Sequence, residues 1–436
     1  MQQYANHLDT LRVRYQTALS ANGYDQVIIN AGQLTYYADD DHAHPFHPYP
    51  FAQQWLPYRL VPNTFVVISL HDKPRLIWPA QEDFWHVSPQ EPQGEWTEHW
   101  RITGAMTLKD WLPSLSGNIA WLGPVPTELN QLAPQIAVNP SGMKSTLAYQ
   151  RAYKTPYEVQ WLIEASERGV AGHRAAKQAF YEGLSELEIY RAFLTASGQR
   201  EIDEPYPGIV GVNASAAVLH YEHKSPRRPD SARTLLIDAG AQANGYASDI
   251  TRTYTTSDGL FGALLADMDV LQRNLVAGAT VGTAFPELHT RALQGVADIL
   301  RQHKLCTLSV DEQMAKRIPQ VFYPHGLGHL LGLQVHDLTG HQIDIMGTVQ
   351  KPTEEAPFLR LTRTLETDMV LTIEPGLYFI PMLLKHMTDT HHQHGCDLTL
   401  IEQLMPFGGI RIEDNILVTA QGPRNLTREA FVDSAG

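Results

Sequence analysis

Five short segments in the second half of this chain place acidic or histidine side chains on strands that are otherwise apolar or β-branched, and they constrain the fold more than any other feature. The first, residues 235–240, is an aliphatic run that carries Asp238. The second, residues 248–254, alternates in period two and carries Asp249. Two glycines between these segments predict a hairpin in which the two aspartates face each other. Opposed buried carboxylates repel each other and lose hydration, so a cation between them is the simplest compensation, and two exposed strand ends are the alternative.

The third and fourth segments add imidazoles and a glutamate. Residues 325–329 space His325 and His329 four apart, but the intervening glycines argue against a helix. One of these histidines is therefore expected to be a ligand, with the other near it. Residues 369–376 predict a strand that ends at Glu374, whose backbone the following proline holds extended.

The fifth segment, residues 408–415, predicts a strand on which Arg411 and Glu413 point to the same side. A buried Arg–Glu pair also has an ordinary structural interpretation. Between the third and fourth segments, His336 adds a further imidazole.

Together these segments offer a set of ligands for two divalent cations. Four carboxylates balance the charge of two such ions and leave a bridging hydroxide as the nucleophile. Oxygen-dominated ligation favours Mn²⁺ over metals that prefer thiolates, although such a site also accepts Co²⁺ or Zn²⁺. The predicted ligands are Asp238, Asp249, one of the two histidines of residues 325–329, Glu374 and Glu413.

Composition limits the partners and the location of the chain. A net charge of −14 argues against nucleic acid or anionic lipid as the main partner. The chain has two cysteines, Cys306 and Cys396, which rule out a disulfide framework and leave only one isolated bridge possible. The sequence contains neither a signal-peptide pattern nor an apolar run long enough to span a membrane. We therefore expect a cytoplasmic protein.

The chain is long enough for two domains, and the pattern changes near residue 150. Residues 1–150 alternate strands and helices, with a strand at Gln26–Asn30 and a hairpin over residues 64–78, and predict a smaller α/β domain. Residues 151–436 begin with long helices, for which Thr155 and Ser185, each followed by glutamate three residues on, are expected N-caps. The fold class is α/β, or α+β.

The motifs resemble those of bacterial Xaa-Pro dipeptidases, or prolidases, in the pita-bread metallopeptidase superfamily. The similarity extends over nearly the whole chain and implies a C-terminal pita-bread catalytic domain, an Xaa-Pro dipeptide as substrate and a homodimer. The subgroup also includes organophosphorus acid anhydrolases, so organophosphate hydrolysis is an expected side activity. The motifs lie at residues 55–57, 236–240, 249–253, 325–329, 333–337, 373–376 and 406–415.

The resemblance also implies roles for single residues. The metal ligands would be Asp238, Asp249, His329, Glu374 and Glu413, with Asp249 and Glu413 bridging both ions. Glu374 would move the proton of the attacking water, and His325 and His336 would line the pocket, with His336 beside the scissile carbonyl. The free carboxylate of proline would meet Arg411 and His220, the last in residues 219–221.

Two other functions stay open at this point. An aminopeptidase P would remove the first residue from longer Xaa-Pro peptides, and a non-catalytic binding module would keep the fold without the chemistry. All five ligand positions are filled, which argues against the binding module. Two histidine-rich segments have no assigned role: residues 42–47, which in similar dimers reach the neighbouring site, and residues 386–394, interpreted as a solvated loop with metal capture as the alternative.

Overall fold

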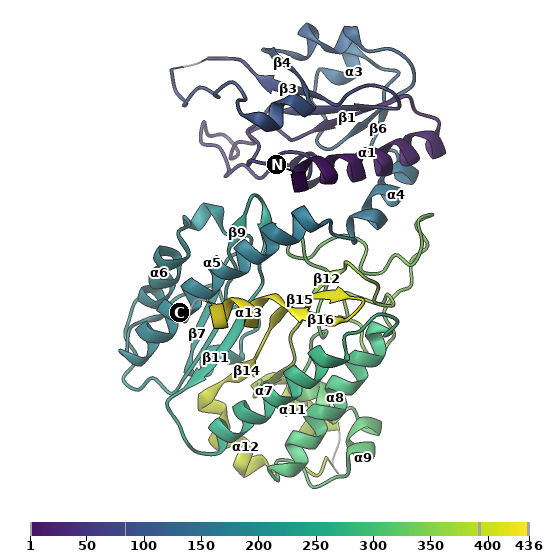
Figure 1. Cartoon of the computed structure of the whole chain (residues 1–436). Coiled ribbons are helices and arrows are strands. Elements are labelled where there is room, and N and C mark those ends of the chain that lie inside the picture. Colours follow the sequence, from purple (N-terminus) through teal and green to yellow (C-terminus); the bar gives the residue numbers. More distant parts are fainter. Residues whose placement is uncertain (1, 83, 391–393, 434–436) are drawn as a thin grey trace. The chain divides into compact units, whose positions relative to one another are not determined.

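The structure is a computed structural model that describes residues 2–82, 84–390 and 394–433 and divides into two compact units (Figure 1). His391 and His392 of the histidine-rich segment lie outside the described residues. The first unit contains the chain up to Arg151 with Thr155–Val159 and Asp344–Thr348. The second contains Ala152–Lys154, Gln160–Ile343 and the chain from Val349 onward.

The first unit is built on a six-stranded mixed sheet with strand order β4-β3-β2-β1-β5-β6. Strand Gln26–Asn30 and the antiparallel hairpin of β2 and β3 confirm the predictions for this part of the chain. The strands are β1 (Gln26–Asn30), β2 (Phe65–Ser69), β3 (Arg75–Pro79), β4 (Arg101–Ala105), β5 (Ile119–Leu122) and β6 (Ala137–Val138). The helices are α1 (Gln2–Asn22), α2 (Pro50–Gln53), α3 (Leu129–Leu132) and α4 (Ser141–Arg151), with short 3₁₀ turns at Glu95–His99, Leu108–Asp110 and Leu112–Ser114.

The rest of the chain carries small sheets and the longer helices. Its strands are β7 (Ile209–Val212), β8 (Thr234–Asp238), β9 (Gln242–Ala243), β10 (Tyr246–Ala247), β11 (Thr251–Thr255), β12 (Val370–Ile373), β13 (Gly376–Tyr378), β14 (Gly409–Arg411), β15 (Asp414–Thr419) and β16 (Gly422–Asn425). Its helices are α5 (Pro156–Tyr181), α6 (Glu186–Ser197), α7 (Leu260–Gly278), α8 (Phe285–Gln302), α9 (Val310–Ala315), α10 (Ile318–Phe322), α11 (Pro381–Thr390), α12 (Leu398–Leu404) and α13 (Leu426–Asp433), with 3₁₀ turns at Glu201–Asp203, Asn213–Ala217 and Met405–Phe407.

Both predicted helix starts are confirmed by reciprocal capping bonds. The Thr155 N–H donates to Glu158 Oε2 at 2.8 Å, and the Glu158 N–H donates to Thr155 Oγ1 at 3.4 Å. Ser185 and Glu188 form the same pair of bonds at the start of α6. Each box satisfies two N–H groups that a helix end otherwise leaves without a partner.

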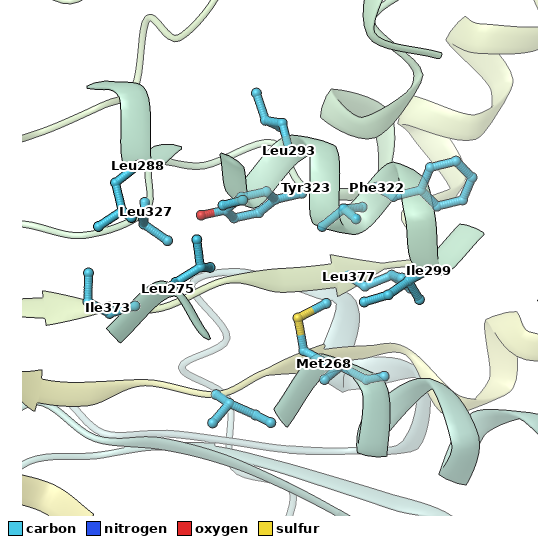
Figure 2. Packing of buried hydrophobic residues seen from close by; sticks show 14 of the residues in the cluster. Met268, Leu275, Leu288, Leu293, Ile299, Phe322, Tyr323, Leu327, Ile373 and Leu377 are labelled. Carbon is cyan, nitrogen blue, oxygen red and sulfur yellow. The ribbon is translucent and has the colours of Figure 1, made fainter. Parts of the chain in front are cut away.

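The largest apolar core packs α7, α8 and α10 against the strands that precede and follow Glu374 (Figure 2). Residues of α8 that face this core recur every three or four positions, as an amphipathic helix requires. Ile373 and Leu377 are both fully buried in the same cluster. The backbone that carries Glu374 is therefore anchored on both sides by close packing.

Strands β8 and β11 form the predicted hairpin, but the expected register is wrong. Asp238 pairs with Thr251, and the same register continues through β9 and β10 to a turn at Asn244 and Gly245. Both turn residues have positive φ, as a two-residue type I′ hairpin turn requires. This turn places Gly240 opposite Asp249, so the two aspartates are diagonal neighbours on one face instead of a directly opposed pair.

Two findings bear on the expected location. Cys306 and Cys396 are both free thiols, although their backbones pair in an isolated antiparallel bridge. Among the described residues, no helix combines the length and the apolar composition that crossing a bilayer requires.

Candidate metal centre

Four predicted ligands lie at or next to strand ends of the second unit. Asp238 is the last residue of β8, and Asp249 lies two positions before β11. Glu374 directly follows β12, and Glu413 lies between β14 and β15. An isolated bridge pairs Thr251 with Glu413, and the Glu413 N–H donates to the Thr251 carbonyl at 3.0 Å. The aspartate hairpin is thereby joined to the strand pair that carries Glu413.

The fifth predicted ligand, His329, lies in an irregular segment held against β12. Residues 325–329, all of them described, form no helix, as the glycines predict. The His329 N–H donates to Thr372 Oγ1 at 3.2 Å, and its carbonyl accepts from the Thr372 N–H at 2.9 Å. A Cβ at position 328 would lie 2.0 Å from the Thr372 carbonyl oxygen, so Gly328 is needed for this close approach.

The side chains of these segments converge on one buried cluster. Asp249, His329 and Glu413 each offer a ligand atom, and these atoms lie within 4.8 Å of one another. His329 Nε2 is 3.3 Å from Asp249 Oδ2 and 3.8 Å from Glu374 Oε1. The Asp249 and His329 side chains are 7% and 4% exposed, so water screens this group only weakly.

Tyr206 connects Asp238 to this cluster, and the sequence analysis missed it. Its hydroxyl lies 2.8 Å from Asp238 Oδ1 and 2.5 Å from Asp249 Oδ1. A Cβ at position 240 would lie 2.9 Å from Tyr206 Cε1, so Gly240 leaves room for the ring. Tyr206 stands between two prolines, Pro205 and Pro207. This pattern indicates a restricted backbone and gives no sign of the contacts that Tyr206 makes.

The hydrogen bonding of His329 suits a metal ligand. Its Nδ1 lies 3.0 Å from the Leu330 carbonyl oxygen, which can only accept a hydrogen bond. Nδ1 therefore carries a proton, and Nε2 faces Asp249 and Glu374, where it donates a hydrogen bond to Asp249 while it is protonated and would offer its lone pair to a bound cation. Histidine ligands usually hold their second ring nitrogen in this way.

Arg411 is the cation that contacts this carboxylate group most directly. Its Nη2 donates to Asp238 Oδ2 at 2.6 Å, and its Nη1 donates to the Tyr378 hydroxyl at 2.9 Å. Its Nε donates to Thr251 Oγ1 at 3.2 Å, and that hydroxyl donates to Glu413 Oε2 at 2.7 Å. Arg411 thus holds Asp238 directly and Glu413 through Thr251.

Electrostatics in the cluster show a shortage of positive charge. Burial raises the pKa of Glu374 to about 7 and raises the pKa values of Asp238 and Glu413 above their ordinary range. Burial acts on Asp249 in the same direction, but the hydrogen bond and charge of His329 outweigh it and lower the pKa of Asp249. Four carboxylates are therefore gathered where Arg411 and His329 make the direct contacts, which is less positive charge than four ionised acids carry.

This donor set fits divalent cations. The carboxylates of Asp238, Asp249, Glu374 and Glu413 are hard oxygen donors, and His329 offers an oriented imidazole nitrogen. Divalent cations would stabilise the ionised forms of Asp238, Glu374 and Glu413, whose pKa values burial raises.

The predicted pocket histidines lie around the cluster. His325 Nδ1 is 3.6 Å from Glu374 Oε2, and His325 Nε2 is 2.8 Å from the Tyr378 hydroxyl. The His336 ring meets the His329 ring edge to face, with centroids 4.4 Å apart. His220 is exposed and follows the turn at Asn213–Ala217. The structure therefore brings the five predicted ligands, Arg411, His325 and His336 to one region of the second unit.

Replacing Tyr206 with phenylalanine is expected to weaken metal binding about tenfold to a hundredfold, as is usual for residues that orient ligands. The phenol holds the oxygens of Asp238 and Asp249 at fixed positions, and Phe keeps the ring but removes that bond. Metal titration by calorimetry measures the effect. Tyr254→Phe makes the same change on β11 and is the matched control. Equal losses of metal affinity in both variants would contradict the assignment of Tyr206.

Acidification is expected to weaken the binding of Mn²⁺. Below pH 7 Glu374 increasingly carries a proton, because burial has raised its pKa to about 7, and the cation must displace that proton. The apparent association constant should fall about tenfold per pH unit for each displaced proton. Calorimetric titrations at pH 6 in buffers of different ionisation enthalpy should show proton release. Proton uptake, or tighter binding at lower pH, would contradict this expectation.

Known proteins resemble the chain along almost its full length. Residues 2–149 match the family model of the Xaa-Pro dipeptidase N-terminal domain, and residues 160–420 match metallopeptidase family M24. An Xaa-Pro dipeptidase from Cronobacter sakazakii is 41% identical over 432 residues, which cover 98% of each chain. One from an Enterobacter species is 40% identical over the same length, again 98% of each chain.

Solved structures show the same fold at lower identity. Aminopeptidase P from Escherichia coli, in its low-pH form, is 22% identical with a TM-score of 0.73, and the match covers 96% of this chain and 95% of that one. An aminopeptidase from Pseudomonas aeruginosa is 22% identical with a TM-score of 0.72, over 97% of this chain and 95% of that one. Another solved form of the Escherichia coli protein is zinc-substituted and holds a product.

Proposed function

The chain belongs to metallopeptidase family M24, and from that membership we propose that it is a dipeptidase that hydrolyses the bond before proline in Xaa-Pro dipeptides. The family predicted from the sequence is confirmed, and so is the α/β N-terminal part followed by a pita-bread catalytic part. The enzyme depends on divalent metal ions. The observation that carries the proposal is the buried group of Asp249, His329 and Glu413, with Glu374 3.8 Å from His329 Nε2 and Asp238 joined to Asp249 through Tyr206.

We further propose that the metal ligands are Asp238, Asp249, His329, Glu374 and Glu413, and that the physiological ion is Mn²⁺. When bound, two such ions would polarise the scissile carbonyl and activate the attacking water. The preference for Mn²⁺ rests on the oxygen-rich donor set.

Glu374 is the proposed proton carrier. Its Oε1 lies 3.8 Å from His329 Nε2, so the carboxylate stands inside the cluster where the attacking water would be activated. In the proposed reaction its carboxylate accepts the proton of the attacking water and delivers it to the proline nitrogen that leaves. His325 lies beside it with Nδ1 3.6 Å from Glu374 Oε2, and His336 would face the scissile carbonyl.

His220 and Arg411 are proposed to recognise the free carboxylate of the dipeptide. His220 is exposed and close enough to influence His325 and His336, so a carboxylate beside it would also lie near the cluster. Arg411 offers a planar guanidinium, which suits carboxylates, but it already donates to Asp238 and Tyr378. Because Arg411 already binds these two groups, kinetic measurements decide whether it also binds the substrate carboxylate.

The test of the proposed function is release of proline from Leu-Pro by the purified chain with Mn²⁺. A chelated sample provides the control, and no release above that control would contradict a dipeptidase. The runner-up is an aminopeptidase P activity, which the fold of the solved structures also suits. A comparison of Leu-Pro with a longer peptide that begins with Leu-Pro separates the two activities. A dipeptidase should prefer Leu-Pro, in which proline carries the free carboxylate.

Organophosphate hydrolysis is proposed as a side activity of the same centre, because an activated water attacks phosphorus much as it attacks a carbonyl. Fluoride release from a fluoridate substrate would measure it. We also propose a cytoplasmic location, which the two free thiols support, and a domain boundary near residue 150.

A homodimer is expected in solution. The sequence suggests a bare aromatic loop from His44 to Trp55, but the structure buries Phe51 and Trp55, so the support comes from Phe84 and Trp85, which are 86% and 77% exposed. Exposed aromatic groups of this kind are typical of interaction surfaces. Light scattering at micromolar concentration should therefore give twice the chain mass of 48.8 kDa. A single species at the chain mass would contradict the dimer.

A further inference from the structure

A buried ion pair lies next to His336 and has no part in the mechanism described so far. Lys154 Nζ is 2.8 Å from Asp337 Oδ2, and the two side chains are 1% and 2% exposed. The partners are 183 positions apart in the sequence. Neither residue belongs to the proposed ligand set or to the proposed carboxylate pocket.

Lys154 is fixed to the strand that leads to Glu374. Its N–H donates to the Asp368 carbonyl at 2.8 Å, and the preceding residue, Tyr153, pairs with Met369 in an isolated bridge. Met369 directly precedes β12. The backbone of Lys154 is therefore tied to the same part of the second unit as the proposed proton carrier.

Asp337 closes the short loop that carries His336. Its N–H donates to the Leu330 carbonyl at 2.8 Å, one residue after His329 in the sequence. Its second carboxylate oxygen accepts from the Leu338 N–H at 2.9 Å. A Cβ at Gly332 would lie 2.4 Å from Asp337 Oδ2, so a glycine at this position leaves space for the carboxylate. The loop over residues 330–337 is thus pinned at its end by the ion pair.

His336 itself is exposed, so burial does not determine where its ring lies. The ring nevertheless meets the His329 ring edge to face at 4.4 Å between centroids. Its neighbour Asp337 is buried and paired, and this fixes the backbone from which the imidazole extends. The exposed ring therefore owes its placement to a buried contact one residue away.

A buried ion pair is weak evidence for added stability, because the loss of hydration offsets much of the attraction and apolar residues often serve as well. Its more specific use is to select one arrangement of the backbone. We propose that Lys154 and Asp337 are positioning residues that hold His336 at the metal centre. This inference rests on the proposed function, in which His336 acts on the scissile carbonyl.

A double-mutant cycle tests the coupling between Lys154 and His336. Lys154→Met should lower kcat for Leu-Pro about tenfold, with KM within about twofold, because it displaces a group that acts in the transition state. In the His336→Ala background, Lys154→Met should change kcat by less than about twofold, because the imidazole that Lys154 positions is absent. Equal factors in both backgrounds would overturn the proposal. A wild-type enzyme inactive on Leu-Pro would instead overturn the proposed function.

A second measurement does not depend on activity. In protein labelled with ¹⁵N-histidine, the His336 ring signal is the one that His336→Ala removes. That signal should shift in Lys154→Met and stay unchanged in Lys385→Met, which breaks an exposed pair with Asp389 on α11. An unchanged His336 signal in folded Lys154→Met protein would overturn the positioning role.

Because Lys154→Met removes the buried cation that Asp337 contacts, the double variant Lys154→Met/Asp337→Asn provides a neutral pair that keeps the acceptor for Leu338. It should melt closer to the wild-type temperature than Lys154→Met does while retaining the loss in kcat. Recovery of full kcat with the ion pair removed would overturn the proposal.

Discussion

Asp249→Asn should reduce kcat/KM for Leu-Pro by at least about a thousandfold, equivalent to about 4 kcal/mol at 1.36 kcal/mol per tenfold. Asp249 lies at the centre of the cluster, 3.3 Å from His329 Nε2 and 2.5 Å from the Tyr206 hydroxyl. Asparagine keeps the shape of the side chain but removes the charge and one of the two acceptor oxygens that a bridging ligand needs. Metal analysis after dialysis into Mn²⁺ should show fewer than two ions per chain.

Asp298→Asn is the matched control for this variant, because it makes the same chemical change on an exposed turn of α8. The neighbouring Ser248 is unsuitable, since its hydroxyl is fully buried, donates to the Ala165 carbonyl at 2.9 Å and accepts from the Ala241 N–H at 3.0 Å. Full activity of Asp249→Asn with two ions retained would show that the bridging assignment is mistaken.

Arg411→Lys should lower kcat/KM for Leu-Pro by about 1.5–3 kcal/mol, the range for a hydrogen bond to a charged group. The guanidinium donates through three nitrogens to three different acceptors, Asp238, Tyr378 and Thr251. A lysine ammonium is a single point charge and cannot reproduce this fork. The geometry therefore predicts a loss that comes mainly from misplaced ligands.

An ester substrate without a carboxylate separates the two possible roles of Arg411. If the guanidinium holds Asp238 and Glu413, the dipeptide and the ester should lose activity by similar factors. A much larger loss for the dipeptide would show that Arg411 binds the proline carboxylate. In the first case recognition of the carboxylate depends on His220, and His220→Ala should raise KM for Leu-Pro with little effect on the ester.

The sequence predicts the neighbourhood of each carboxylate from local pattern, but only Asp238 lies within a strand. The single strand predicted over residues 408–415 is wrong because β14 ends at Arg411 and β15 begins at Asp414. Period-two alternation identifies the strand that begins near Asp249, and Pro375 after Glu374 marks the end of β12. The glycines of residues 325–329 correctly excluded a helix. The ligand roles themselves remain predictions until the variants are measured.

Other features differ from the sequence-based expectation for two reasons. The hairpin register is local: the two-residue turn at Asn244 and Gly245 places Asp238 opposite Thr251 instead of Asp249. Other contacts depend on tertiary structure. Tyr206 lies 32 and 43 positions from the two aspartates that it joins, and no spacing rule connects them. The same holds for the contact between Lys154 and Asp337, because only the folded chain brings these residues together.

The bridge between Thr251 and Glu413 also has a consequence for the order of folding. It joins segments separated by 162 positions, so the loop between them must close before the two carboxylate-bearing parts can meet. Contacts of such long range form slowly compared with helices such as α7 and α8. Metal uptake during refolding should therefore trail the recovery of helical circular dichroism. A chelator would then act on the end of the folding reaction, while the early helical signal would be the same with or without the ion.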